Sequence, residues 1–270
     1  MNTLTLGQII DELEQRYPQD LAETWDQVGI HFGDRTRYVS KIMTALDIRH
    51  NVIDEAIAQQ VDTIIVHHPP IFQPIQRFDT SREDIRLYQK IIQHNINIYA
   101  LHTNLDIAWN GMNDWIAEQL GLTCVESTLP LDEAGNPGIG RIGLLPSPLS
   151  REDLLTHVKQ VFKLQHLVVM EKTPKAQYQR IAVLGGSGAE YVQDAANAQA
   201  DAFITGDISY HRGHSCYDAN LLTIDVGHYI EAIFIPKMAT LLKKLAHESQ
   251  WDVTVIESQS PTTPFETIIF

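Results

Sequence analysis

The 270-residue sequence is poor in cysteine, in basic residues and in long apolar runs. Its two cysteines, with no CxxC spacing, cannot build a disulfide framework, so we expect two reduced thiols. Twenty basic residues against 34 acidic ones leave a net charge of −14, which disfavours binding to the phosphate backbone of nucleic acid. No apolar stretch has the length of a membrane span, and the polar start does not resemble a signal peptide. We therefore expect a cytoplasmic protein.

Apolar strands alternate with amphipathic helices along the chain. Strands are predicted over residues 41–48, 61–66 and 96–102, and the helices 49–60 and 81–95 separate them. Further helices are predicted over residues 3–17, 110–122 and 151–162. Strands that alternate with helices through short loops are typical of a largely parallel sheet. The expected fold class is therefore α/β.

The first half of the chain recurs in the second. Residues 180–207 align without a gap to residues 41–68, and residues 220–228 then align to residues 97–105. The alignment pairs two strand-end positions: His67 with Gly206, and His68 with Asp207. Any two βαβ units share some likeness, so coincidence is one interpretation. The other is an internal duplication with two similar α/β halves facing a shared site.

Residues 126–141 interrupt the pattern with two prolines and three glycines, which favours a domain boundary there. We expect an N-terminal α/β half over residues 1–126, which carries the motifs HHPP and HTNLD. The C-terminal half over residues 127–270 would carry GGSG, TGDISYH and DVGHYIE. Its last helix could pack on the first half.

The stretch VDTIIVHHPPIF, residues 61–72, joins a buried strand to two adjacent histidines. Two prolines end the strand at His67 and His68, because proline has no N–H to donate to a ladder. Ligands of open α/β sheets bind at the carboxyl ends of strands. The pair by itself fits a metal or catalytic site and equally a turn with two half-buried histidines.

Other imidazole and carboxylate groups also follow predicted strands. His228 and Glu231 lie three residues apart where a helix should begin, so they share one face of it. The candidate ligands are His67, His68, His102, Asp106, His228 and Glu231. Imidazole and carboxylate without thiolate suit zinc, iron, manganese, nickel or cobalt. Two adjacent histidines with two carboxylates exceed the needs of one tetrahedral ion, which favours a two-metal site and hydrolysis.

Two further motifs carry candidate chemistry. GGSGAE, residues 185–190, exposes backbone N–H groups before a helix, and Gly185–Gly188 could hold an anionic part of a substrate. The motif lacks the lysine of a P-loop and the spacing of a Rossmann fingerprint, so a tight structural turn is the alternative. In TGDISYHRGH, His211 could act as a general base or as a hydrogen-bond donor behind a ligand, or it could simply be solvated.

In combination and order, several motifs resemble the GTP cyclohydrolase 1 type 2 homologue family, also called Nif-three-like or YbgI-like. They are WDQVG, IIVHHPPIF, LHTNLD with the following GMND, GGSG, TGDISYH and DVGH, and they cover nearly the whole chain. The resemblance implies two similar, interlinked α/β domains with mostly parallel sheets, a dinuclear metal centre between them, and a homo-hexameric ring. Some members of the family also carry a long inserted domain, for which this chain has no room.

The resemblance also implies roles for the candidate residues. It makes His67 and His68 ligands, Asp106 a bridging ligand with His102 beside it, and His228 a ligand together with Glu231. Some members place that glutamate four residues after the histidine, where this chain has Ala232.

The leading functional hypothesis is a metal-dependent hydrolase with two divalent ions per chain and a small substrate that contains a nucleotide or phosphate. One alternative is a scaffold or metal-handling protein without turnover. Another is an interaction protein in transcription or DNA metabolism, against which the acidic charge argues.

Overall fold

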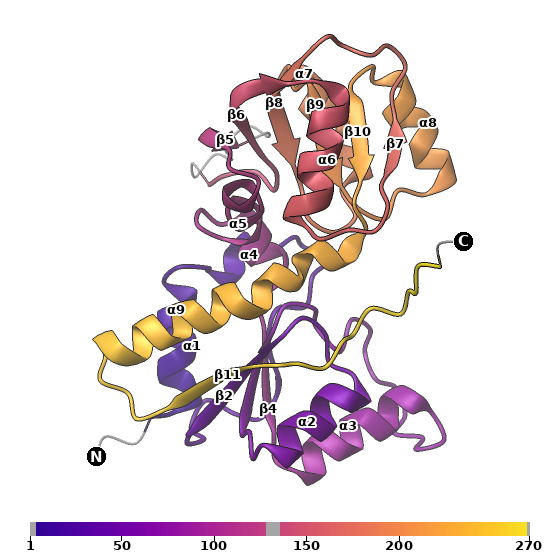
Figure 1. The fold of residues 1–270 in the computed structure, drawn as a ribbon. Coiled ribbons are helices and arrows are strands. Elements are labelled where there is room, and N and C mark those ends of the chain that lie inside the picture. The colour runs from indigo at the N-terminus through magenta and orange to yellow at the C-terminus, as the bar shows by residue number, and fades with distance from the viewer. Residues whose placement is uncertain (1–3, 128–135, 269–270) are drawn as a thin grey trace. The chain divides into compact units, whose positions relative to one another are not determined.

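The computed structural model describes residues 4–127 and 136–268 and divides into two compact units (Figure 1). The first unit comprises Met1–Leu105 and Phe234–Pro264, and the second comprises Asp106–Ile233 and Phe265–Phe270. The chain therefore crosses between these units after Leu105, whereas the Pro- and Gly-rich residues 126–141 predict a boundary near residue 126. Half of the Pro- and Gly-rich segment expected to form that boundary, residues 128–135, lies outside the described residues.

The sheet of the first unit has the strand order β1-β4-β3-β2-β11. Four strands run parallel, and β1 pairs antiparallel with β4 at one edge. This arrangement confirms the predicted α/β class with a largely parallel sheet. The strands are β1 (Gly29–Phe32), β2 (Lys41–Ala45), β3 (Thr63–Val66), β4 (Asn97–Ala100) and β11 (Thr254–Glu257).

Helices cover both faces of this sheet. Alternate residues of a strand point to opposite faces, so neighbouring residues of β2 contact different helices. Met43 and Ala45 belong to a buried cluster with residues of α2 and α3. Between them, Thr44 donates its hydroxyl to Ile235 O on α9, 2.8 Å away, on the opposite face. The helices are α1 (Leu6–Glu14), which has a capping box at Thr5, η1 (Gln19–Leu21), α2 (His50–Ala58), α3 (Glu83–Gln93) and α9 (Phe234–Glu248).

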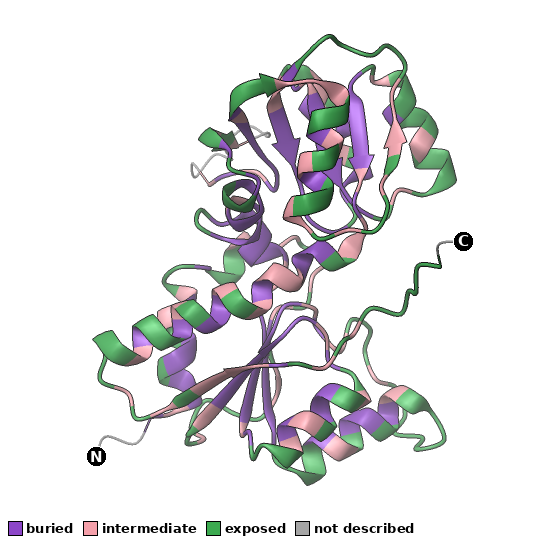
Figure 2. Cartoon of the chain, viewed as in Figure 1, coloured by how far each residue is buried: buried purple, intermediate pink, exposed green. Residues whose placement is uncertain are grey.

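The second unit has a mixed sheet with the order β5-β6-β8-β9-β10-β7. Its centre, β8-β9-β10, is parallel, and antiparallel strands flank the centre on both sides. Figure 2 shows these central strands buried, as in the first unit. The strands are β5 (Thr123–Ser127), β6 (Arg141–Leu149), β7 (Val168–Met170), β8 (Tyr178–Val183), β9 (Ala202–Thr205) and β10 (Leu222–Asp225).

Short helices join the strands of the second unit, and α4 (Thr103–Ile107) crosses the division between the units. The others are α5 (Met112–Gln119), α6 (Arg151–Val161), η2 (Ala189–Tyr191), α7 (Val192–Asn197), α8 (Tyr210–Asp218) and η3 (His228–Ile233). Among the described residues, no helix combines the length and the apolar character of a membrane span. The two cysteines are unlinked, Cys124 exposed and Cys216 buried.

The internal repeat is visible in strand register. Ile42 pairs with Thr63 between β2 and β3, and Ile181 pairs with Ala202 between β8 and β9, as the gapless alignment requires. The aspartates that the alignment pairs also have the same role. Asp62 accepts hydrogen bonds from the N–H groups of residues 40 and 41, and Asp201 accepts from those of residues 179 and 180. Both carboxylates thus hold the start of a central strand.

The last part of the alignment was wrong by two residues. Asn97 pairs with Thr63, and the residue that pairs with Ala202 in the second unit is Leu222 rather than Asn220. The segments before β4 and β10 differ in length. The alignment of the two repeats needs a gap in these segments. The apolar pattern of a four-residue strand is too short to show where that gap lies.

Candidate metal centre

His67 and His68 follow β3 in the first unit. Their backbone N–H groups donate to Ala45 O and Leu46 O at 3.3 and 3.0 Å, so the pairing with β2 continues past the end of the strand. His67 is fully buried and His68 is half-buried. His102 follows β4, and one ligand atom from each of the three histidines lies within 4.8 Å of the other two. The first unit therefore gathers three imidazoles at one edge of its sheet.

The partners of His67 and His68 determine which ring nitrogen could bind a metal. His67 Nδ1 lies 2.8 Å from Leu101 O, and His68 Nδ1 lies 2.6 Å from Asp47 Oδ1. A carbonyl or carboxylate oxygen only accepts, so each Nδ1 must carry the proton. In a neutral imidazole the lone pair is then on Nε2. Metal-bound histidines are oriented in this way in proteins.

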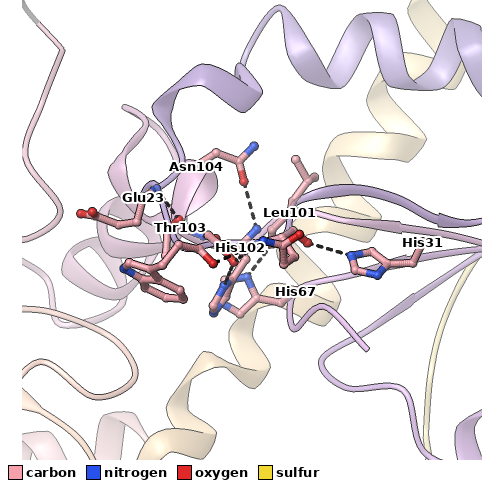
Figure 3. A network of polar contacts seen from close by, with 10 residues as sticks. Glu23, His31, His67, Leu101, His102, Thr103 and Asn104 are labelled. Carbon is pink, nitrogen blue, oxygen red and sulfur yellow. Dashed lines mark hydrogen bonds and ion pairs between the residues drawn. The ribbon is translucent and has the colours of Figure 1, made fainter. Parts of the chain in front are cut away.

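His102 repeats the arrangement, as the network in Figure 3 shows. Its Nδ1 donates to Asp26 Oδ1 at 2.8 Å, while Asp26 Oδ2 accepts from the backbone N–H of Thr103 at 3.0 Å and from its hydroxyl. Burial by itself would raise the pKa of Asp26, but the hydrogen bonds from His102 and Thr103 outweigh it and lower the pKa to about 2. Asp26 is therefore ionised and holds the ring of His102 in place.

The second unit contributes an imidazole between two carboxylates. His228 and Glu231 begin η3, a 3₁₀ turn, in which residues three apart lie directly above each other. His228 Nε2 lies 2.9 Å from Glu231 Oε2, and its Nδ1 lies 2.8 Å from Asp207 Oδ2. The sequence predicted that this pair shares one helical face. A cation bound at Nε2 would take the place of a proton between these two groups.

The glycine-rich loop after β8 packs against Glu231. A Cβ on Gly186, whose φ is +65°, would lie 2.7 Å from Glu231 Oε1. Two N–H groups of the loop already have partners: Gly185 donates to Asn113 Oδ1 at 2.8 Å and Gly188 to Thr205 Oγ1 at 2.9 Å. These two amides are not available to an anion, and the anion site at Gly185–Gly188 stays a prediction.

Asp106 is buried, and the backbone at and after it is held by two buried side chains. Asn113 Nδ2 donates to Asp106 O at 3.2 Å. Arg141 Nη2 donates to Ile107 O and Ala108 O at 2.8 and 2.9 Å. Asn113 also accepts from the glycine loop, so it connects the peptide of Asp106 to the loop that packs against the carboxylate of Glu231.

His211 lies on α8, where its side chain is exposed and contacts the ring of Tyr210 edge-on at 5.6 Å. Ser209 caps this helix by accepting from the backbone N–H of Arg212. The proposed role of His211 as a base or as a donor behind a ligand stays a prediction.

Sequence reasoning missed the carboxylates that orient the histidines. Asp26 lies within the WDQVG motif, and Asp47 follows a strand just as the candidate ligands do. Each is an acidic residue in a loop or at the end of a strand. The candidate ligands have the same kind of position, so position does not distinguish the two roles. The roles of Asp26 and Asp47 depend on contacts 76 and 21 positions away in the chain, which no local pattern contains.

The family model of Duf34/NIF3 (NGG1p interacting factor 3) matches residues 4–264. The chain belongs to this family. A protein of Streptococcus pneumoniae described as a GTP cyclohydrolase 1 type 2 homolog is 40% identical over 97% of this chain and 99% of its own length. A relative in Lactococcus lactis with the same description is 36% identical, covering 94% and 96%. These matches confirm the resemblance that the motifs predicted.

Solved structures of NIF3-like proteins share the fold. A hypothetical protein of Staphylococcus aureus superposes with a TM-score of 0.92 at 27% identity, covering 99% of this chain and all of that one. A Bacillus cereus protein related to NIF3 reaches a TM-score of 0.93 at 24% identity, with the same coverage, which supports the fold alone. A Bacillus subtilis relative, 26% identical, aligns over 363 positions, more than the 270 residues of this chain. That relative therefore contains additional residues, as expected for members with an inserted domain.

Proposed function

We propose that this NIF3-family protein binds two divalent metal ions and hydrolyses a small substrate that contains a nucleotide or phosphate. One observation carries the proposal: all four candidate histidines have Nδ1 within 2.6–2.8 Å of a carbonyl or carboxylate oxygen. Such partners direct Nε2 toward a ligand position and increase the basicity of the ring. Four imidazoles oriented in the same way are more than ordinary turns require.

The ligand set supports a centre with more than one ion. The residues that would hold the ions are His67, His68 and His102 from the first unit and Asp106, His228 and Glu231 from the second, and we propose that Asp106 bridges the ions. Six nitrogen and oxygen ligands exceed the four of a tetrahedral site. Glu231 and Asp106 are buried, and coordination of a metal ion is one way in which proteins stabilise buried carboxylates. The set lacks thiolate and suits zinc, iron, manganese, nickel or cobalt.

The chain's own residues would perform the remaining tasks. Bound divalent ions lower the pKa of their water toward about 7 and polarise the bond to be cleaved. Trp25 and Phe72, 58% and 41% exposed, contact His102 edge-on and offer apolar surface for a planar ring such as a nucleobase. We propose that the loop at Gly185–Gly188 faces an anionic group of the substrate and that His211 moves a proton.

Metal content tests the centre directly. We expect about two equivalents per chain in protein purified without chelator or affinity metal. The content should fall in His68→Ala and in Asp106→Asn, because each change removes a ligand. His247→Ala, at an exposed position in the last turn of α9, is the matched control and should keep the parent's content. A parent without metal and with unchanged variants would refute the centre.

Turnover is tested separately. We expect metal-dependent cleavage among phosphate esters and cyclohydrolase substrates that disappears in Asp106→Asn, while circular dichroism shows the fold intact. His211→Ala should keep its metal and lose rate. Full metal content without turnover of any such substrate would instead indicate a metal-binding scaffold. The mass of the native protein in light scattering tests the homo-hexamer, which we propose on the family resemblance.

A further inference from the structure

The chain forms a strap in the first unit after β11, which we define as residues 258–262 (Figure 1). Glu55 on α2 fixes its start by accepting from Ser258 Oγ, Gln259 N and Ser260 N at 2.8, 2.9 and 3.1 Å. Asn51 Nδ2 donates to Pro261 O at 2.8 Å. The strap is therefore held along its length by hydrogen bonds to α2.

The strap ends on a carboxylate of the candidate metal centre. Thr262 Oγ1 donates to Asp47 Oδ2, and the other oxygen of the same group, Asp47 Oδ1, accepts from His68 Nδ1 at 2.6 Å. A continuous chain of hydrogen bonds thus runs from Thr262 through Asp47 to His68. Asp47 lies in the loop between β2 and α2.

We propose that the strap is a positioning element for the metal ligand His68, with Thr262 as the positioning residue. This inference rests on the proposed metal centre. A carboxylate held at one oxygen can rotate about its terminal torsion, which is broad and has no strong preference. A second donor on the other oxygen fixes the plane, and the fixed plane orients the imidazole. Asp26 has the same two-sided support from His102 and Thr103.

The pairing of β11 with β2 brings the strap close to Asp47. β11 pairs parallel with β2, so its carboxyl end lies beside the carboxyl end of β2, where Asp47 follows. The residues after β11 therefore need only a short path to reach Asp47. Thr262 thus acts on a ligand of the centre through Asp47, which lies 215 positions away from it in sequence.

Metal affinity of three variants in the full chain tests the strap. Thr262→Val removes the hydroxyl at nearly constant volume and should weaken metal binding about 2–10-fold, the equivalent of one hydrogen bond. Thr262→Ser keeps the hydroxyl and should restore the parent's affinity. Thr36→Val removes the same kind of hydrogen bond, from a threonine hydroxyl to Asp34 Oδ1, at an exposed position outside the strap, and should leave affinity unchanged. Equal affinity in Thr262→Val and the parent would overturn the proposal.

A second measurement needs no metal. In the metal-free protein, ¹⁵N NMR of His68 should show a single neutral tautomer with the proton on Nδ1, and Thr262→Val should mix the two tautomers. An unchanged tautomer in Thr262→Val contradicts the strap's role. If the parent takes up no metal but the tautomers respond as expected, the metal centre fails and the positioning of His68 by Thr262 stands.

Discussion

The two units share a three-stranded parallel centre, yet the same backbone positions have opposite chemistry. His67 and His68 follow β3, whereas Gly206 and Asp207 follow β9 at the equivalent positions. In the first unit all three candidate ligands are imidazoles. In the second unit a glycine stands at the position of His67, and the candidate ligands His228, Glu231 and Asp106 lie elsewhere in the sequence. The repeated βαβ unit therefore sets the backbone positions from which side chains project. The residue type at each position decides whether the side chain is a candidate metal ligand.

The edges of the two sheets differ as well. Beside β2 lies the parallel strand β11, while the equivalent strand β8 has the antiparallel β6 as its neighbour. A parallel neighbour ends at the same edge as the ligands, so the chain after it can reach the site. The strap is a consequence of that edge, and the described part of the second unit has no counterpart to it.

The largest expected effect on stability comes from adding a side chain at Gly206, the position equivalent to His67. A Cβ on Gly206 would lie 2.6 Å from the backbone carbonyl of Gly227, so Gly206→Ala should lower the free energy of unfolding by about 1–3 kcal/mol. Gly213→Ala on α8 is the control, since its Cβ meets only Met170 Sδ at 3.6 Å. We expect that change to stabilise by about 0.5–1 kcal/mol. Urea denaturation measures both, and equal values would contradict the steric argument.

The second prediction compares the orienting carboxylates. Asp47 and Asp26 each accept hydrogen bonds on both oxygens, whereas Asp207 is exposed and accepts from His228. An amide has one accepting oxygen, so Asp47→Asn and Asp26→Asn should weaken metal binding about 10–100-fold.

Asp207→Asn is the matched case in the second unit. Its amide oxygen can still accept from His228, so the loss should stay below about tenfold. Competition with a chelator gives the three affinities. A loss in Asp207→Asn as large as in Asp47→Asn would remove the distinction between the units.

The third prediction separates backbone strain from contact with Glu231. Gly186 and Gly121 have φ values of +65° and +75°, and alanine at either should cost about 1 kcal/mol of stability. A Cβ at Gly121 meets nothing within 4 Å, whereas one at Gly186 meets Glu231 Oε1 at 2.7 Å. Only Gly186→Ala should therefore also reduce metal content. Metal loss in both variants would show that strain, and not the contact, is responsible.

The smallest effect is the pH dependence of Asp201, the counterpart of Asp62. Burial would raise its pKa, but hydrogen bonds from Lys175 and from the N–H groups of Arg180 and Gln179 outweigh it and hold the pKa below its usual range. A group with a lowered pKa stabilises the fold above its unfolded pKa, and the contribution is lost as pH falls through the folded value. Asp201→Asn should flatten the stability profile below about pH 4. An unchanged acid profile in thermal unfolding would contradict this.

Much of the architecture was readable from local pattern. The alternation of apolar strands and helices predicted the α/β class, and prolines after His67 and His68 marked the end of a strand. The gapless alignment of the two βαβ units found the register of β2 with β3 and of β8 with β9, because both strands and their spacing lie within one short segment. The candidate ligands followed from residue type at strand ends.

By itself, the sequence determined the family, the fold class and which side chains are candidate ligands, because these depend on residue type and local periodicity. Only the tertiary structure decided that His67, His68 and His102 each bond to the protein through Nδ1. That choice depends on Leu101 O and on Asp26 and Asp47, which reach the rings through strand pairing and loop packing. The contact of the strap with Asp47 was likewise decided by the tertiary structure, since Thr262 meets Asp47 only when β11 pairs with β2. Hydrogen bonds between segments that are distant in sequence produce no local pattern from which they could be predicted.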